Sequence, residues 1–353
     1  MSLEQLGWDP FFATAFAACA GPGEIAGRVA RADRGRYLAF TADGEIDTET
    51  SGRFRHLAPQ ASGRPVAGDW VVLAAEGRRI TAVLPRRTCF SRKQAGERTE
   101  EQVLASNVDV VFLVAGLDGD FNPRRLERYL LLAWESGATP VIVLNKSDAC
   151  EDPQRAIADT RAVAAGASVL LLSALNDDGL GQLGACVATG QTAALLGSSG
   201  VGKSTIVNRL LGRQAQRVQP VRDSDSRGRH TTTHRELIPL PEGWLLMDTP
   251  GLRELQLWGT GDGIERVFTD IAALAEQCRF RDCRHQGEPG CAVAEAIEQG
   301  RIETDRLESY TKLQRELDYL ERKQDTRAAA EQNRVWRNIH RAMRRMPDKR
   351  GGY

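Results

Sequence analysis

The chain has 353 residues, enough for about two or three domains, and its 41% apolar residues suffice for packed cores. It contains no run of about twenty apolar residues, which excludes a protein built on membrane-spanning helices. Basic and acidic residues balance at 47 each, and seven cysteines in a chain of this length do not suggest a disulfide scaffold. We therefore expect a multidomain cytoplasmic protein.

The segment 1–21 combines an apolar run with a small-residue end, as a secretory signal does. It has no basic residues at its start and carries Glu4 and Asp9. We interpret it as a short amphipathic helix rather than a signal peptide.

Short β-like runs separated by glycine, aspartate and proline occupy residues 24–85, without a helical period. About five such strands favour a small β-barrel of the OB type, and an SH3-like barrel fits the pattern almost equally well. In the stretch 21–95 basic residues outnumber acidic ones. We assign residues 1–95 to an N-terminal helix and an OB-type barrel.

Apolar strand-like runs and helical stretches alternate between residues 100 and 258, which predicts a doubly wound α/β sheet. The predicted strands are 108–116, 139–145, 168–174, 192–197 and 243–249. We assign residues 96–260 to this domain.

The run "GSSGVGKST" (197–205, hereafter the phosphate loop) matches the pattern G-x-x-x-x-G-K-[ST] in full. It follows an apolar run and opens a helical pattern, which is the context that the motif needs. Its backbone N–H groups can surround phosphates, Lys203 can neutralise them, and the Ser204 hydroxyl can reach Mg²⁺. The expected nucleotide-binding residues are Gly197, Ser198, Ser199, Gly200, Val201, Gly202, Lys203, Ser204 and Thr205.

The run "DTPG" (248–251) begins at the end of the predicted strand 243–249, a position where a carboxylate can hold Mg²⁺. Asp248 is therefore a magnesium candidate, and Gly251 can offer its N–H to a γ-phosphate. Between the two motifs lies the polar stretch 222–236, in which we favour Thr232 as a further magnesium ligand.

Leu252 follows "DTPG", where Ras-like proteins place a glutamine that orients the attacking water. Leucine cannot orient water, so basal hydrolysis should be slow. His230 is the nearest replacement, with His234 or a group from a partner as alternatives.

The run "NKSD" (145–148, the base loop) ends a predicted strand. The Asp148 carboxylate can accept hydrogen bonds from the N1–H and 2-amino groups of guanine, and adenine has no such donor pair. The predicted strand 168–174 ends in a second base loop, Ser173 to Leu175, where a backbone N–H can meet the guanine carbonyl. The expected base-binding residues are Asn145, Lys146, Ser147, Asp148, Ser173 and Ala174.

These parts follow an unusual order, because both base loops precede the phosphate loop. Together they indicate GTP rather than ATP. Permutation of a fold is physically allowed, since chain termini often lie close together.

A cysteine-rich segment follows at 278–291. Three thiolates and one imidazole would complete a closed tetrahedral zinc site, which is typical of structural zinc. Its members are Cys278, Cys283, His285 and Cys291. The stretch 334–353 is strongly basic, which suits either a polyanionic partner or a solvated helix. We assign residues 261–353 to an α-helical zinc-binding domain with a basic C-terminal helix.

Taken together, "NKSD", "SAL", "GSSGVGKST", "GRHTTT", "DTPG" and the Cys-Cys-His-Cys segment resemble the RsgA (YjeQ or EngC) family of circularly permuted GTPases. The resemblance covers nearly the whole chain. It implies an OB-fold domain, a permuted GTPase domain and a zinc domain. It also implies GTP hydrolysis that the small ribosomal subunit stimulates, rRNA as partner and a role in late subunit maturation.

A GTP-regulated switch that binds a non-ribosomal protein is the alternative function. A zinc-dependent DNA binder is a weaker one, because the cysteine segment has no recognition-helix pattern. No oligomerisation seam is evident, so we expect a monomer.

Overall fold

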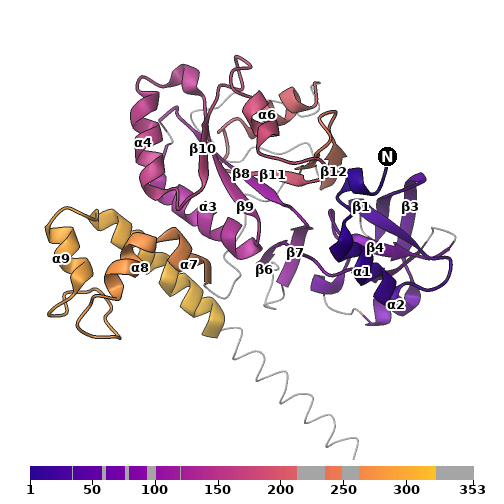
Figure 1. The fold of residues 1–353 in the computed structure, drawn as a ribbon, viewed down its shortest axis with the longest axis horizontal. Helices are drawn as coiled ribbons and strands as arrows, with labels where there is room; N and C mark the ends of the chain where they lie inside the picture. The colour runs from indigo at the N-terminus through magenta and orange to yellow at the C-terminus, as the bar shows by residue number, and fades with distance from the viewer. Residues whose placement is uncertain are drawn as a thin grey trace, which may run out of the picture.

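The structure is a computed structural model that describes residues 1–33, 35–57, 61–75, 79–93, 101–119, 121–212, 235–248 and 262–322. Along the chain it forms a small β-barrel, a central α/β layer and a C-terminal helical part, which lies on the far side of the central layer from the barrel (Figure 1). The predicted fold class is thereby confirmed.

Five strands close the N-terminal barrel in the order β1-β2-β3-β5-β4-β1. They are β1 (Ile25–Asp33), β2 (Arg36–Thr41), β3 (Gly44–Thr50), β4 (Trp70–Leu73) and β5 (Arg79–Val83). Strands β3 and β5 run parallel, while the other pairs run antiparallel. The closed Greek-key order confirms the OB-type barrel over the SH3-like alternative.

The predicted N-terminal helix is α1 (Pro10–Cys19), which begins after the short 3-10 turn η1 (Glu4–Leu6). The Asp9 carboxylate accepts from the N–H groups of Phe11 and Phe12 and so caps the helix. Phe12 and Trp8 pack against Trp70 of the barrel. The helix therefore covers an apolar surface of the barrel.

Six strands form the central sheet in the order β10-β9-β8-β11-β13-β12. They are β8 (Val110–Gly116), β9 (Thr139–Asn145), β10 (Ser168–Leu171), β11 (Thr192–Leu196), β12 (Glu236–Pro239) and β13 (Leu245–Asp248). All neighbours are parallel except β12 and β13. Strand β11 lies in the middle, between the earlier strand β8 and the later strand β13.

The buried strands alternate between two cores, because successive side chains of a strand point to opposite faces. In β8, Val111 and Leu113 join the core under α3 (Pro123–Ser136), whereas Phe112 and Val114 join the core under α6 (Lys203–Leu210). Two covered faces explain why these strands read as continuous apolar runs. The other helices of this layer are α4 (Pro153–Val163), α5 (Gly181–Ala185) and the 3-10 turn η3 (Ser147–Ala149).

The hairpin of β6 (Cys89–Lys93) and β7 (Glu101–Ser106) joins the barrel to the central layer. No strand was predicted from the sequence in this segment. The remaining short elements of the barrel are α2 (Gly52–Leu57) and the 3-10 turn η2 (Ala61–Gly63).

The C-terminal part contains α7 (Asp262–Val267), α8 (Thr269–Ala275), α9 (Ala292–Glu298) and a helix at 304–322. Its apolar residues, such as Phe268 and Leu313, join the core under α3. Figure 1 shows this part beside α3. Among the described residues no helix has the length and apolar character needed to cross a membrane.

Candidate nucleotide site and metal centre

The predicted nucleotide-binding segments meet at one edge of the central sheet. The base loop follows β9, the phosphate loop follows β11, and Asp248 ends β13. Because these strands are parallel, their carboxyl ends lie at the same edge, where open α/β sheets bind ligands. The fold thus brings residues 145, 197 and 248 to the same edge of the sheet, although the motifs follow one another along the chain in a rotated order.

The glycines of the phosphate loop are required by close backbone approaches. A Cβ on Gly197 would lie 2.2 Å from the Val114 carbonyl oxygen. A Cβ on Gly202 would lie 2.2 Å from Nδ2 of Asn145, and its φ of 96° also favours glycine. The loop therefore packs directly on the ends of β8 and β9.

Lys203 begins α6, and its side chain turns back over the phosphate loop. Its Nζ donates to the carbonyl oxygens of Gly197 at 2.7 Å and Ser198 at 2.5 Å. Ser204 and Thr205 follow in the first turn, where helix N–H groups and the helix dipole favour an anion. The arrangement concentrates positive charge beside the loop.

Asn145 is buried and joins three loops. Its Nδ2 donates to the Val201 carbonyl at 2.8 Å, and its Oδ1 accepts from the Ala174 N–H at 2.9 Å. Both ends of the amide are thus used to hold the base loop, the phosphate loop and the second base loop in register. The sequence pattern indicated a base contact for Asn145 but not this linking role.

Asp148 is exposed, and its carboxylate accepts a hydrogen bond from the Ser173 hydroxyl. Ser147 is the third residue of the base loop, and its N–H donates to the Leu172 carbonyl at 3.2 Å. Lys146 has φ 65° and forms an ion pair with Asp118. The sequence reasoning missed Asp118, because nothing local links the turn after β8 to the base loop.

Arg209 is a second residue that the sequence reasoning missed. It lies on α6, and its guanidinium donates to the carbonyls of Ala174 at 3.2 Å and Leu175 at 2.7 Å. It supports the second base loop from the helix that follows the phosphate loop. Its position in an ordinary amphipathic helix carries no signal for this contact.

We call the stretches that contain "GRHTTT" and "DTPG" the switch segments. Four candidates from them lie outside the described residues: Thr232, Gly251, His230 and His234. Their expected contacts with Mg²⁺, phosphate and water stay predictions. Asp248, the last residue of β13, is described and half-buried.

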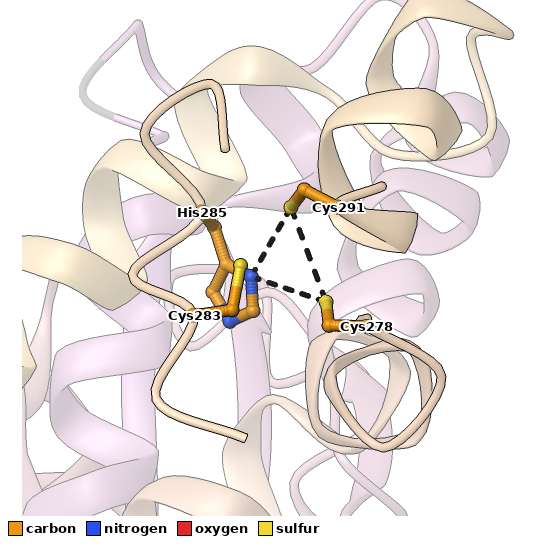
Figure 2. Close-up of side chains that lie close together, drawn as sticks. All are labelled: Cys278, Cys283, His285 and Cys291. Carbon is orange, nitrogen blue, oxygen red and sulfur yellow. Dashed lines mark hydrogen bonds between the residues drawn. The ribbon is translucent and has the colours of Figure 1, made fainter. Parts of the chain in front are cut away.

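The four predicted metal ligands converge at one point between α8 and α9 (Figure 2). Their ligand atoms all lie within 4.8 Å of one another. Nδ1 of His285 is 3.4 Å from Sγ of Cys291 and 3.7 Å from Sγ of Cys278, and those two sulfurs are 4.0 Å apart. Bonds of about 2.3 Å to a tetrahedral ion imply edges of nearly this length. The residues therefore fit one thiophilic cation with no open position.

The local backbone and electrostatics also suit metal binding. Cys291 caps α9, where its Sγ accepts from the Ala294 N–H at 3.3 Å. Burial disfavours the imidazolium and lowers the pKa of His285, which keeps the ring in the neutral form that binds metals. Partial burial raises the pKa of Cys278, but the N–H groups of α9 and the neighbouring thiols outweigh it, so the pKa is lowered overall. A lowered pKa favours the thiolate.

A phosphate loop after the middle strand, a base loop after an earlier strand and an OB-type barrel at the N-terminus define a circularly permuted P-loop GTPase. Comparison with known proteins leads to the same class. The sequence model of the RsgA GTPase family matches residues 83–258.

The small ribosomal subunit biogenesis GTPase RsgA of Opitutus terrae is 47% identical to this chain, over 98% of the chain and 97% of that protein. The protein of the same name from Streptomyces coelicolor is 46% identical, over 99% and 96%. The chain belongs to the RsgA GTPase family.

Solved structures agree with this assignment. The crystal structure of YjeQ from Thermotoga maritima is 25% identical, covers 83% of this chain and 98% of its own, and gives a TM-score of 0.61. The structure of YloQ, described as a circularly permuted GTPase, is 26% identical, covers 84% and 95%, and gives a TM-score of 0.59.

Proposed function

We propose that this GTPase acts in late maturation of the small ribosomal subunit, binds its rRNA in the GTP state and leaves after hydrolysis. The observation that carries the proposal is the joining of the base loop and the phosphate loop by the Asn145 amide. It makes one guanine nucleotide site from segments that the chain order separates. Relatives that match this chain end to end carry the name of a subunit-biogenesis GTPase.

The phosphate loop, residues 197–205, holds the phosphates through backbone N–H groups. Lys203 exchanges its carbonyl partners for the β- and γ-phosphate oxygens, which are stronger acceptors for an ammonium. Ser204, Asp248 and Thr232 would hold Mg²⁺, which would offset the negative charge of the phosphates. Gly251 donates its N–H to the γ-phosphate.

Asp148 selects guanine by accepting from its N1–H and 2-amino groups. Ser173 orients that carboxylate, because its hydroxyl already donates to Asp148. The second base loop, around Ala174, offers a backbone N–H to the guanine carbonyl. The aliphatic stem of Lys146 lies over the guanine ring. His230 positions the attacking water, with His234 or a group of the subunit as the alternatives.

The Cys278, Cys283, His285 and Cys291 site holds one structural zinc ion. Its function is to fix the turns between α8 and α9. The barrel, this part of the chain and the basic stretch 334–353 are the surfaces for rRNA. We place the protein in the cytoplasm as a monomer.

The proposal is tested by measuring binding to purified small subunits with GDP and with a non-hydrolysable GTP analogue. We expect at least about tenfold tighter binding with the analogue, since the γ-phosphate, which GDP lacks, offers an acceptor to the Gly251 N–H. Asp148→Asn should lose this effect with the guanine analogue and regain it with the xanthine analogue, whose 2-oxo group accepts from an amide. Asp159→Asn, an exposed carboxylate on α4, is the matched control.

Equal affinity with GDP and with the analogue would contradict the proposal. Binding that resists both salt and ribonuclease would instead favour a protein partner and the alternative function.

A further inference from the structure

Helix α3 has three faces with three different partners. Leu126, Leu130 and Ala133 are buried against the central sheet. A second stripe, at positions 125 and 129, contacts the phosphate loop. A third stripe, at 124, 127, 128 and 135, contacts the C-terminal part. Such spacings of three, four and seven place residues on common faces of a helix.

The stripe that faces the phosphate loop holds one side chain, Ser198. Nη1 of Arg125 donates to the Ser198 hydroxyl at 2.8 Å, and the Tyr129 hydroxyl lies 3.4 Å from the same oxygen. The Ser198 carbonyl accepts from Lys203. Ser198 is therefore held through its side chain by α3 and through its backbone by the phosphate-binding lysine.

The third stripe, which faces the C-terminal part, contributes to a buried ion network. The fully buried Glu127 carboxylate accepts from Arg124 at 2.6 Å and from Arg306 at 2.7 Å through the same oxygen. Arg306 also binds Asp270 of α8, with one contact at 2.8 Å. A buried charge network of this kind holds one geometry, because a displaced partner leaves a desolvated charge unpaired.

Further contacts extend the attachment along the helix. Arg128 binds Glu316 through two hydrogen bonds of 2.6 and 2.8 Å. The Glu135 carboxylate accepts from the Gly263 N–H at 2.6 Å, and the Arg266 guanidinium lies 4.0 Å from the centre of the Trp134 ring. Figure 1 shows α3 between the sheet and the C-terminal helices.

We propose that α3 couples the C-terminal part to the phosphate loop, with Arg125 as the positioning residue. The proposal rests on guanine nucleotide binding at residues 197–205 and adds the regulation of that site. When a partner binds the C-terminal part, the ion pairs between this part and α3 move the helix as a rigid body. This movement displaces Arg125 and Tyr129 relative to Ser198. It thereby shifts the backbone of the phosphate loop, which contacts the phosphates.

A double-mutant cycle tests the coupling with the full-length protein. The variants are Arg128→Gln, Ser198→Ala and the two combined, and the readout is the dissociation rate of fluorescent GDP and of a fluorescent GTP analogue. The hydrogen-bond partner of Arg128 is Glu316 of the C-terminal part and not the phosphate loop, yet we expect Arg128→Gln to change at least one rate about three- to tenfold. In the Ser198→Ala background the same substitution should have no further effect.

Two further variants separate coupling from general damage. The swap of Arg128→Glu with Glu316→Arg should restore the wild-type rates, since it re-forms the ion pair. Arg155→Ala, an exposed arginine on α4, should leave the rates unchanged. Restoration by the swap is not expected if Arg128→Gln acts by loosening the fold.

The coupling is overturned if Arg128→Gln behaves like Arg155→Ala, or if its effect persists in full beside Ser198→Ala. Either result leaves the proposed function intact, because wild-type nucleotide binding is measured in the same experiment. If the wild-type protein binds no guanine nucleotide, the proposed function fails and the coupling fails with it.

Discussion

Arg28 of β1 joins four segments of the molecule at a single buried guanidinium. It donates to the carbonyls of Leu6, Gly68 and Asn107 and to the Thr192 hydroxyl of the central layer. Burial lowers the pKa of Arg28 to about 10, and the charges of nearby carboxylates oppose this shift. The cation is kept because its acceptors are oriented toward it.

We predict that Arg28→Met lowers the free energy of unfolding by about 3 kcal/mol, since four acceptors lose their donor in a buried setting. Arg31→Met on the same strand is the matched control. Its ion pair with Asp33 is partly exposed, so the loss should stay within about 0.5 kcal/mol. Denaturant unfolding measures both, and equal losses would show that burial of Arg28 is irrelevant.

At the scale of elements, the Cys/His site connects the ends of the segment between α8 and α9. His285 has φ 59°, and the loop between Cys278 and Cys291 contains no strand or helix among its described residues. Burial and the neighbouring thiols raise the pKa of Cys283 to about 12, so metal binding must displace its proton.

We therefore predict that Cys291→Ser removes the bound zinc and exposes this segment to proteases, because it deletes a thiolate ligand while the serine hydroxyl can still cap α9. Zinc content should fall from one ion per chain to none. Cys186→Ser, at a half-buried thiol far from the cluster in sequence, should retain one ion. Full zinc retention in Cys291→Ser would refute the assignment of that ligand.

Strands with a local apolar signal were predictable, and β9 begins and ends at the residues predicted. The β6–β7 hairpin was not, because its strands are polar and their pairing is settled by contacts with other segments. The three faces of α3 were hidden for a related reason. An amphipathic pattern shows which side of a helix is buried, but Arg124 and Arg125 look alike until their partners are known.

The candidate site divides in the same way. Motif spacing was enough to predict that the four Cys/His residues cluster and that the motif loops meet at one edge of the sheet, since each motif needs particular residue types at short separations. Asp118, Arg125 and Arg209 escaped because their contacts join segments that are distant along the chain.

At the scale of the whole molecule, the C-terminal part is attached to the GTPase domain by ion pairs as well as by the apolar core under α3. Burial raises the pKa of Asp270, but its hydrogen bonds and ion pair with Arg306 outweigh burial, so the pKa is lowered overall. A lowered pKa in the folded state means that the ion pair contributes stability above the ordinary aspartate value of 3.8. This contribution is lost as pH falls through the folded-state pKa.

We predict that acidification from pH 6 to below the ordinary aspartate pKa of about 4 destabilises the wild-type protein more than Asp270→Asn. The amide cannot titrate, so its variant lacks this source of pH dependence. Unfolding of both proteins across this range measures the difference, with Asp159→Asn on α4 as control. Parallel curves for wild type and Asp270→Asn would show that the Asp270–Arg306 pair, which lies within the C-terminal part beside the Arg306–Glu127 contact to α3, does not contribute this stability.

The most direct measurement is GTP turnover by the full-length protein with and without purified small ribosomal subunits. Leu252 stands where a water-orienting glutamine would be, so turnover alone should be slow. Added subunits should raise it at least about tenfold, by placing the switch segments and the C-terminal part in their active arrangement. Equal turnover in both conditions would contradict the proposed function.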